Sequence, residues 1–285
     1  MNDMSVDDLK DKILITGAGG FVGFYLMKKL KRFNPIGITY NPSRQFENFY
    51  SVNLIEKNNV EEVLQTFKPK VVFHLAALTN PAVNEKNREL AKASNIDMTR
   101  NLVEALPPDT KLIFHSTDKI WSGNDSYPDE HSEPDPNTYH GELKINGEKL
   151  IREGIERHHI LRLSVIHSYT YQAPISELAG PGQMIEKSLD KLAEGGKAEF
   201  FSNINRCFTK REELLSLHEM ILSNENYGTY NVGSKMTSYY DRVKNLCSEL
   251  SISSDNLSSI IGEINPIEQN MNMEKFEATF SIKFT

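Results

Sequence analysis

Short apolar runs alternate with longer amphipathic segments through the first half of the chain. The apolar runs, which predict buried strands, lie at residues 12–16, 36–40, 70–76, 111–116 and 159–164. Between them, apolar residues recur every three to four positions and predict helices at about 22–32, 60–67, 94–106 and 141–154. Strands that are apolar throughout and separated by helices indicate a parallel sheet covered on both faces. We therefore expect a doubly wound α/β fold.

Beyond residue 164 this alternation becomes less regular. A segment rich in Pro, Gly and Ala at 172–182 precedes the remaining elements. They are helices at about 183–193, 211–223, 239–250 and 273–280, and short strands near 199–202 and 229–232. We interpret them as a smaller α/β region that packs beside the sheet and leaves a cleft. The predicted division is a large domain at residues 1–166 and a smaller region at 167–285, with some exchange of chain between them.

Composition limits the partners that the protein can have. The 285 residues include 32 Lys and Arg against 39 Asp and Glu, a net charge of −7. An acidic chain matches a polyanion poorly, so no nucleic-acid partner is expected. The two cysteines form no disulfide framework, which is typical of a reducing compartment. No apolar run approaches the roughly 20 residues of a membrane helix, and the polar N-terminal segment does not resemble a signal peptide. A cytoplasmic protein without membrane contact is therefore the expectation.

The first predicted strand runs directly into a glycine-rich turn. Gly17, Gly20 and Gly23 follow the spacing GxxGxxG, and Phe21 and Val22 lie within it. The first glycine permits a tight turn, the second lets a pyrophosphate approach the backbone, and the third lets the next helix pack against the sheet. The start of that helix offers N–H groups and the positive end of its dipole to phosphates. The pattern predicts a Rossmann dinucleotide-binding site with Gly17, Gly20, Phe21 and Val22 among its contacts.

The end of the second predicted strand bears on which dinucleotide is preferred. Proteins that prefer NAD usually carry Asp or Glu there to bind the ribose 2′-hydroxyl. Residues 40–44 hold no acid here, and Arg44, next to Ser43, could bind a 2′-phosphate through two guanidinium N–H groups. We therefore expect NADP(H), with NAD(H) as the alternative.

Further segments resemble the motifs of extended short-chain dehydrogenases/reductases. They are VVFHLAALT at 71–79, HSTDKIWSG at 115–123, LRLSVIHS at 161–168 and GTYNVGSK at 228–235. Over nearly its whole length the chain is most similar to dTDP-4-dehydrorhamnose reductases and their sugar-nucleotide-binding relatives. The resemblance implies that Ala76 and Ala77 lie against the cofactor and that Asn53 and Leu54 lie near its adenine.

The resemblance also implies a set of catalytic residues. In these reductases a Thr or Ser binds the sugar carbonyl, a Tyr donates the proton, and a Lys one helical turn later holds the nicotinamide ribose and lowers the pKa of the Tyr. Thr117 matches the first position, and Lys144 matches the Lys because KINGE at 144–148 is similar to the family's K-L-x-G-E. The Tyr position, four residues before Lys144, is His140, while Tyr139 would be turned away from Lys144 on a regular helix.

Three interpretations of this departure are open. His140 donates the proton as a weakly acidic neutral imidazole, or Tyr139 reaches the site because it lies at the irregular start of the helix. In the third, the site has lost hydride chemistry. The expected function is an NADPH-dependent reductase of a nucleotide-linked 4-keto deoxysugar in surface polysaccharide synthesis. The alternatives are an epimerase or dehydratase of the same superfamily, and a non-catalytic regulatory protein that binds a dinucleotide or a nucleotide sugar.

The nucleotide sugar is expected in the cleft between the two parts of the chain. Asp118 follows the Thr of the catalytic set, and Trp121 falls at the mouth of the fifth strand, where it could stack on a sugar or a base. Arg206 lies in the segment where related enzymes hold the nucleotide diphosphate. Since helix-mediated dimers are common in the superfamily, a homodimer is a further expected partnership.

Histidines are also placed near predicted strand ends. His74 and His115 lie at the carboxyl edge of the sheet, where ligands bind in this architecture. No acid or cysteine completes a ligand set at a telling spacing, so no metal site is predicted. The pair His158 and His159 precedes a strand and is expected at the surface.

Overall fold

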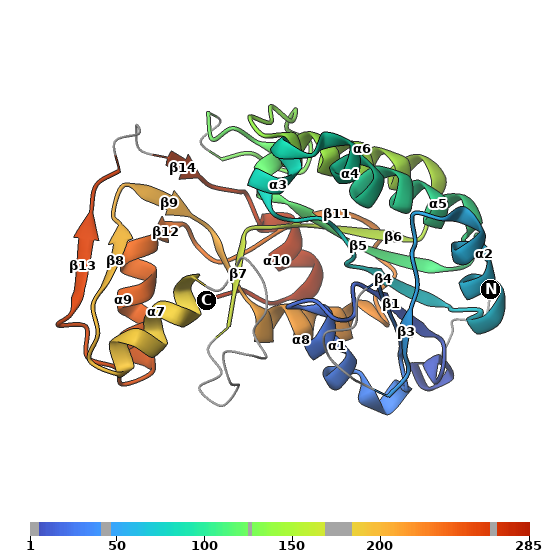
Figure 1. Cartoon of the computed structure of the whole chain (residues 1–285), viewed down its shortest axis with the longest axis horizontal. Helices are drawn as coiled ribbons and strands as arrows, with labels where there is room; N and C mark the ends of the chain where they lie inside the picture. The colour runs from blue at the N-terminus through green and yellow to red at the C-terminus, as the bar shows by residue number, and fades with distance from the viewer. Residues whose placement is uncertain (1–5, 41–46, 125–126, 169–183, 263–266) are drawn as a thin grey trace.

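The computed structural model describes residues 6–40, 47–124, 127–168, 184–262 and 267–285. Its main element is a seven-stranded sheet in the order β11-β6-β5-β4-β1-β2-β3, in which all neighbours are parallel (Figure 1). The strands are β1 (Ile13–Thr16), β2 (Ile36–Thr39), β3 (Phe49–Ser51), β4 (Val71–His74), β5 (Lys111–Thr117), β6 (His158–Leu163) and β11 (Gly228–Val232). The chain winds outward in opposite directions from β1 and from β4, so the predicted doubly wound fold is confirmed.

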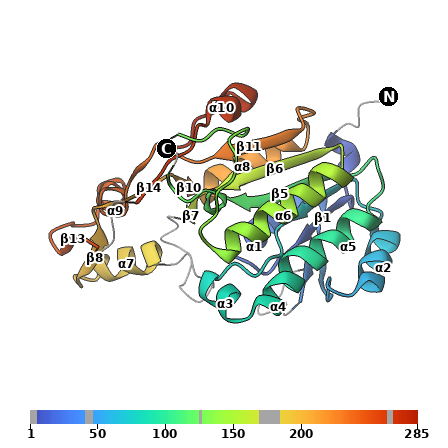
Figure 2. The same cartoon turned by 90° about the horizontal axis from the view of Figure 1, so that it is seen from above.

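Helices cover both faces of this sheet, which explains the uninterrupted apolar runs. Ile15 points to the face covered by α1 (Gly23–Lys29) and α8 (Arg211–Ile221), whereas its neighbour Leu14 points to the other face. That other face is covered by α2 (Lys57–Phe67), α5 (Met98–Ala105) and α6 (Tyr139–Gly154) (Figure 2). Because side chains alternate along a strand, a strand buried on both faces needs apolar residues at every position.

The connection from β4 to α5 is built from several short helical pieces. They are α3 (Pro81–Lys86), α4 (Arg88–Lys92) and a π-helical turn (Ala93–Asp97). The helix predicted at 94–106 is therefore a π turn followed by α5, and a π turn is a common feature of functional sites. Single 3-10 turns lie at Val6–Leu9, Lys31–Phe33 and Asp118–Ile120.

Beside the large sheet, the described residues form three small sheets and the two helices α7 (Met184–Ala193) and α9 (Tyr239–Glu249). The sheets are β7 (Val165–His167) with β10 (Phe208–Lys210), β8 (Ala198–Phe201) with β13 (Leu257–Ile260), and β9 (Ile204–Arg206) between β12 (Thr237–Ser238) and β14 (Ile267–Gln269). The helices α7 and α9 enclose an apolar core with β8, in which Leu189, Phe200 and Leu246 are buried.

One predicted strand belongs to a different sheet from the one we expected. The strand near 229–232, placed by the sequence in the smaller region, is β11 and pairs with β6 at the edge of the large sheet. The helix α10 (Glu274–Phe280) packs against it, and the hydroxyl of the buried Tyr230 donates to the carbonyl of Asn226. The expected exchange of chain thus extends to a whole strand and helix. The boundary at residue 166 stays a prediction.

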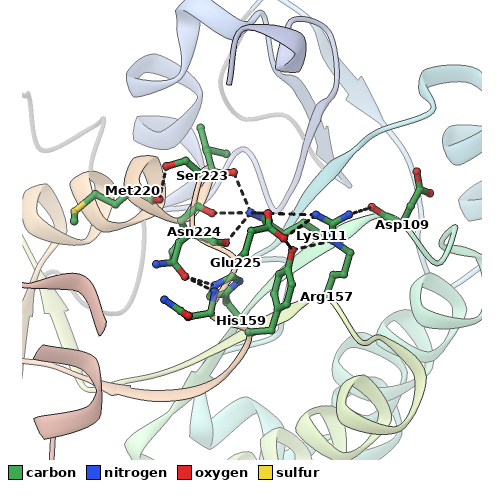
Figure 3. Close-up of polar contacts among 12 residues, drawn as sticks. Asp109, Lys111, Arg157, His159, Met220, Ser223, Asn224 and Glu225 are labelled. Atoms are coloured by element: carbon green, nitrogen blue, oxygen red, sulfur yellow. Dashed lines mark hydrogen bonds and ion pairs between the residues drawn. The ribbon is translucent and has the colours of Figure 1, made fainter. Parts of the chain in front are cut away.

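Lys111, a buried lysine at the amino end of β5, joins this strand to the end of α8. It lies on the side of the sheet opposite to the carboxyl ends of the strands, where the predicted site is. The Nζ atom of Lys111 donates to the carbonyl oxygens of Ile221 (3.1 Å), Leu222 (3.0 Å) and Asn224 (2.8 Å) and lies 3.1 Å from the Glu225 carboxylate (Figure 3). These carbonyls end a helix and have no partner within it, so the lysine satisfies them and complements the helix dipole. Burial lowers the pKa of Lys111, and Glu225 partly opposes this.

Replacing Lys111 by Met is expected to lower the free energy of unfolding by about 2–3 kcal/mol, because the Leu222 and Asn224 carbonyls would lose their Lys111 donor at once. Urea unfolding followed by circular dichroism measures the change. The matched control is Lys57→Met, which removes an exposed ion pair with Glu104 and should lower the free energy of unfolding much less, because solvent screens exposed charges. Equal losses in the two variants would contradict the role assigned to Lys111.

The surface position expected for His159 is wrong. His159 is fully buried in β6, its ring lies 6.1 Å from that of Tyr230, and its Nε2 atom is 3.4 Å from the Asn224 side-chain oxygen. Burial lowers its pKa to about 4. The strand begins one residue earlier than predicted, at His158, so that His159 turns toward the core.

Candidate active site

The glycine turn after β1 packs directly against the end of β4. Gly17 has a φ of 68°, and a Cβ atom on it would lie 2.7 Å from the backbone nitrogen of Ala76. A Cβ atom on Gly23 would overlap the carbonyl oxygen of Gly17, and the Gly20 N–H donates to that same oxygen at 2.9 Å. Positive φ and close backbone contact both require glycine here. The structure therefore brings two predicted cofactor contacts, Gly17 and Ala76, together.

A series of buried hydrogen bonds stabilises this glycine turn. The Ala76 N–H donates to the Thr16 hydroxyl (3.2 Å), which donates to Nδ1 of His74 (2.8 Å). On its other side, Nε2 of His74 donates to the Thr99 hydroxyl (3.0 Å), and Thr99 donates to the Asn95 carbonyl (2.6 Å). Burial lowers the pKa of His74 to about 3, so its ring is neutral and has one donor and one acceptor, as this series requires. His74 thus joins β1, the β4 loop and the π turn.

Replacing Gly17 by Ala is expected to weaken dinucleotide binding at least tenfold, because the new Cβ collides with the Ala76 backbone and displaces the turn. Quenching of intrinsic fluorescence on titration with NADPH measures the dissociation constant. The control is Gly195→Ala, since Gly195 also has a positive φ (82°) but a Cβ there meets no atom within 4 Å. An unchanged constant in Gly17→Ala would exclude this turn as the binding site.

Helix α6 presents His140 and Lys144 on one buried face. They are 7% and 6% exposed, respectively. The helix begins at Tyr139 after the Thr138 cap, and a Cβ on Gly141 would overlap the Lys119 carbonyl oxygen, so the helix start lies directly against the loop after β5. The predicted pairing of His140 with Lys144, one helical turn apart, is the pairing that the structure shows. The catalytic roles of the two residues stay predictions.

Lys144 is held at the carboxyl end of β5. Its Nζ atom donates to the His115 carbonyl (2.7 Å) and lies 4.6 Å above the centre of the Phe114 ring. Burial lowers the pKa of Lys144 to about 8, and the Glu148 carboxylate partly opposes this. At neutral pH the side chain is therefore a cation with donor capacity left beyond its single carbonyl partner.

His140 is held by a residue that the sequence analysis did not identify. Its Nδ1 atom lies 3.1 Å from the amide nitrogen of Asn84, on α3. Burial, together with the Lys144 charge, lowers the pKa of His140 to about 4. The imidazole is therefore neutral at physiological pH. Nothing in the sequence marks Asn84, because α3 is short and its contact with α6 is made across 56 residues.

Tyr139 faces away from Lys144. Its hydroxyl lies 3.4 Å from the Arg88 carbonyl, and the Arg88 guanidinium stacks 4.4 Å from its ring centre. The ring lines a cavity of about 440 Å³ between α4, α5 and α6, on the outer side of the helix. The interpretation in which Tyr139 donates the proton stays a prediction that this arrangement does not support.

Thr117 and Asp118 lie where β5 ends. The Thr117 hydroxyl accepts from the Lys119 N–H (3.2 Å) and is 3.3 Å from the Asp118 carboxylate. Asp118 is 1% exposed and accepts hydrogen bonds from Ser164 (2.6 Å) and Arg206 (2.5 Å). The carboxylate thus connects β5 with β9 of the smaller region. Thr117 is half-buried.

The remaining predicted substrate residues are enclosed in the structure. Arg206 is buried with its Nη2 atom on Asp118, so its expected diphosphate contact would have to use the rest of its guanidinium. Trp121 is 1% exposed and lies beneath Arg162, which leaves no open ring face for stacking. Both substrate roles stay predictions that the geometry does not favour. Gln269 on β14, which the sequence did not single out, donates to the carbonyls of Asp118 (2.7 Å) and Trp121 (2.9 Å).

The predicted cofactor contacts are only partly gathered around the glycine turn. Phe21 is half-buried, while Val22 is buried and packs into the core. Leu54 also packs into the core, and the Asn53 side chain accepts from the Ile55 N–H at 3.2 Å. Arg44 lies outside the described residues. Ala77 is half-buried in the loop after β4.

Within the part of the chain that the structure describes, no group of His, Cys, Asp and Glu residues is arranged to hold a metal, and no helix could cross a membrane.

A doubly wound parallel sheet with a glycine turn after its first strand defines a Rossmann-type α/β protein. The chain belongs to the family described as the RmlD substrate binding domain, whose model matches residues 11–283. The resemblance drawn from the sequence is therefore confirmed at the level of the family.

Three individual proteins that match the chain each share less than a third of their aligned residues with it. Methionine adenosyltransferase 2 subunit beta of Bos taurus is 31% identical over 157 residues, 55% of this chain and 47% of that protein. The chain thus spans about half the length of the curated relatives it matches. The dTDP-4-dehydrorhamnose reductase from Bacillus anthracis, solved with NADP, has a TM-score of 0.80 at 21% identity and covers 96% of this chain and 95% of its own. UDP-glucose 4-epimerase of Thermotoga maritima, solved with UDP-glucose, has a TM-score of 0.76 at 20% identity over 96% and 93%. At these identities the solved structures show the shared fold.

Proposed function

We propose that this protein is an NADPH-dependent reductase that converts a nucleotide-linked 4-keto deoxysugar to the alcohol. The observation that supports it most strongly is the joint burial of His140 and Lys144 on one face of α6, at the carboxyl end of β5. In doubly wound sheets, ligands bind at this edge of the strands. The sugar class and a place in surface polysaccharide synthesis are inferred from the family.

The turn after β1 fits a dinucleotide. Gly20 is exposed, and a Cβ atom there would meet only the Gly17 carbonyl oxygen, so without a side chain a pyrophosphate could approach the backbone closely. When bound, the dinucleotide would supply the hydride for the carbonyl carbon. A preference for NADP(H) rests on Arg44, and it is in accord with the NADP bound to the reductase from Bacillus anthracis. Binding constants for NADPH and NADH that are equal, or that favour NADH, would contradict this preference.

Each of the three polar residues has a distinct task in the proposed reaction. Lys144, cationic and held by the His115 carbonyl, uses its free N–H donors to orient the ribose. Thr117 offers its hydroxyl to the sugar carbonyl. His140 donates a hydrogen bond to that oxygen and gives up its proton as the alkoxide forms, after which solvent reprotonates it. A neutral imidazole is a weak acid, but a developing alkoxide is a strong base, and a neutral histidine can polarise a carbonyl in this way.

The decisive experiment follows the loss of NADPH absorbance with a panel of nucleotide-linked 4-keto-6-deoxysugars, using the native protein beside His140→Tyr. Turnover by the native protein would establish a reductase. Activity only in His140→Tyr would mean that the substrate pocket is intact and that the native protein has given up this reaction.

A second function, a non-catalytic binding subunit, has one specific observation in its favour. The residue in the family's Tyr position is a histidine whose pKa is lowered to about 4 by burial, so its ring is neutral at physiological pH, and a neutral imidazole is a weaker proton donor than an activated tyrosine. The relatives that include methionine adenosyltransferase 2 subunit beta make a regulatory role a concrete alternative. Tight binding of NADPH without turnover of any sugar in the panel would favour it.

A further inference from the structure

Asn84 is a buried polar residue on a helix whose other residues are mostly exposed. It is 0% exposed, and it is the one buried residue of α3, where Val83 on the same helix is 38% exposed. An amide that is fully removed from water needs hydrogen-bond partners to offset its lost hydration. The partners of Asn84 are therefore informative about why it is buried there.

The orientation of the Asn84 amide is set by a backbone group. Its Nδ2 atom lies 3.2 Å from the carbonyl oxygen of Leu78 and 3.1 Å from Nδ1 of His140. A carbonyl oxygen can only accept, so the amide end that faces Leu78 must be the donor. The reversed amide would place two oxygen atoms against each other. The N–H groups of one NH₂ therefore serve Leu78 and His140 together.

This orientation determines the form of the His140 ring. Since Asn84 donates to Nδ1, that nitrogen must carry a lone pair, and a neutral imidazole then has its proton on Nε2. The charged groups that act on the ring are Lys144 on its own helix and Asp118 and Lys119 in the turn after β5. The cations among them disfavour a second proton, which also keeps the ring neutral.

We infer that Asn84 is a positioning residue, which holds His140 in the tautomer whose Nε2–H can donate to the substrate carbonyl oxygen. The inference rests on the proposed reduction and adds to it the residue that makes a histidine usable in the Tyr position. The other tautomer would present a lone pair to the carbonyl oxygen and repel it. An amide rather than a carboxylate is required at residue 84, because a carboxylate would accept from Nδ1–H and place the proton on the wrong nitrogen.

The test reads the tautomer directly by long-range ¹H–¹⁵N NMR of the protein labelled at histidine nitrogen, with the His140 signals assigned from His140→Gln. We expect the Nε2–H pattern in the native protein at pH 7. In Asn84→Asp, we expect a protonated Nδ1 and a His140 pKa raised by about 1–3 units. An Nδ1–H tautomer in the native protein, or an unchanged spectrum in Asn84→Asp, would overturn the inference.

Two further variants separate tautomer control from general loss of structure. Asn84→Leu removes the donor without adding a charge, and it should give a mixture of the two His140 tautomers. This variant keeps the inference testable if Asn84→Asp does not fold. Asn231→Leu is the matched control, because Asn231 is also 0% exposed and its amide donates to two carbonyls, those of Pro128 and Asn272, and not to His140. It should leave the His140 signals unchanged. A change as large as that in Asn84→Leu would reduce Asn84 to a packing role.

Steady-state kinetics then tests whether the His140 tautomer affects the reaction. In Asn84→Leu, we expect kcat to fall about 100-fold with KM within about threefold, because the proton donor is affected and binding is not. If the native protein turns over no sugar, the proposed function fails, yet the NMR result still decides whether Asn84 sets the tautomer. If turnover is present and kcat survives in Asn84→Leu, the inference fails and the reductase assignment stands.

Discussion

Replacing His140 by Phe is expected to lower kcat of the proposed reduction by about 10²–10⁴-fold, the usual contribution of a positioned general acid. Phe keeps the volume and the burial of the ring, which is 7% exposed, but it has no N–H to give to the forming alkoxide. Binding of NADPH should change less than about threefold, because the glycine turn is untouched. Steady-state kinetics beside a fluorescence titration measure both quantities.

The matched control for this variant is Tyr139→Phe. The Tyr139 hydroxyl is on the outer side of α6, 3.4 Å from the Arg88 carbonyl, so its removal should leave kcat within about twofold. A large loss in Tyr139→Phe with none in His140→Phe would show that Tyr139 is the donor. It would also mean that the start of α6 rearranges when substrate binds.

Replacing Lys144 by Met is expected to lower kcat/KM about 10³-fold, because the side chain is a buried cation one helical turn from the predicted acid. Met preserves the length and the packing on Phe114 but cannot donate to the ribose. The loss should appear partly in binding of NADPH, which distinguishes it from the loss in His140→Phe. Retained cofactor binding and turnover in Lys144→Met would remove Lys144 from the site.

The pH dependence provides a second measure of Lys144. Its pKa is lowered to about 8, so the cation is present below that pH and is lost as the pH rises through it. In the native protein, kcat/KM should therefore decrease above about pH 8. In Lys144→Arg, any remaining activity should persist to higher pH, because arginine stays charged. A native profile that is flat from pH 7 to 9.5 would contradict the role of the ammonium group.

The free energy of unfolding should also depend on the protonation of Lys144, but it should increase with pH where kcat/KM decreases. The folded Lys144 has a pKa of about 8 and the unfolded one about 10.5, so the unfolded chain binds more protons between these values. The contribution of this residue to stability therefore increases as the pH rises from 8 to 10.5. Burial of a cation at position 144 thus opposes folding at neutral pH, as expected of a side chain kept for function.

Much of the fold and part of the site were predictable from local sequence. The apolar runs define strands buried on both faces, because every position of such a strand meets a covering helix. Gly17 and Gly23 were predictable because close backbone approach excludes a side chain. The shared face of His140 and Lys144 follows from a spacing of four residues on a helix.

Tertiary structure alone decided which groups these residues meet. The sequence predicts a short strand near 229–232, but only the pairing with β6 decides which sheet it joins. From the sequence we expected Arg206 and Trp121 to contact a ligand, but long-range packing buries both side chains. Asn84 meets His140 across 56 residues, through the packing of α3 on α6. A sequence specifies local conformation and burial directly, whereas the partner of a buried polar group is fixed only when distant elements pack and each donor must find an acceptor.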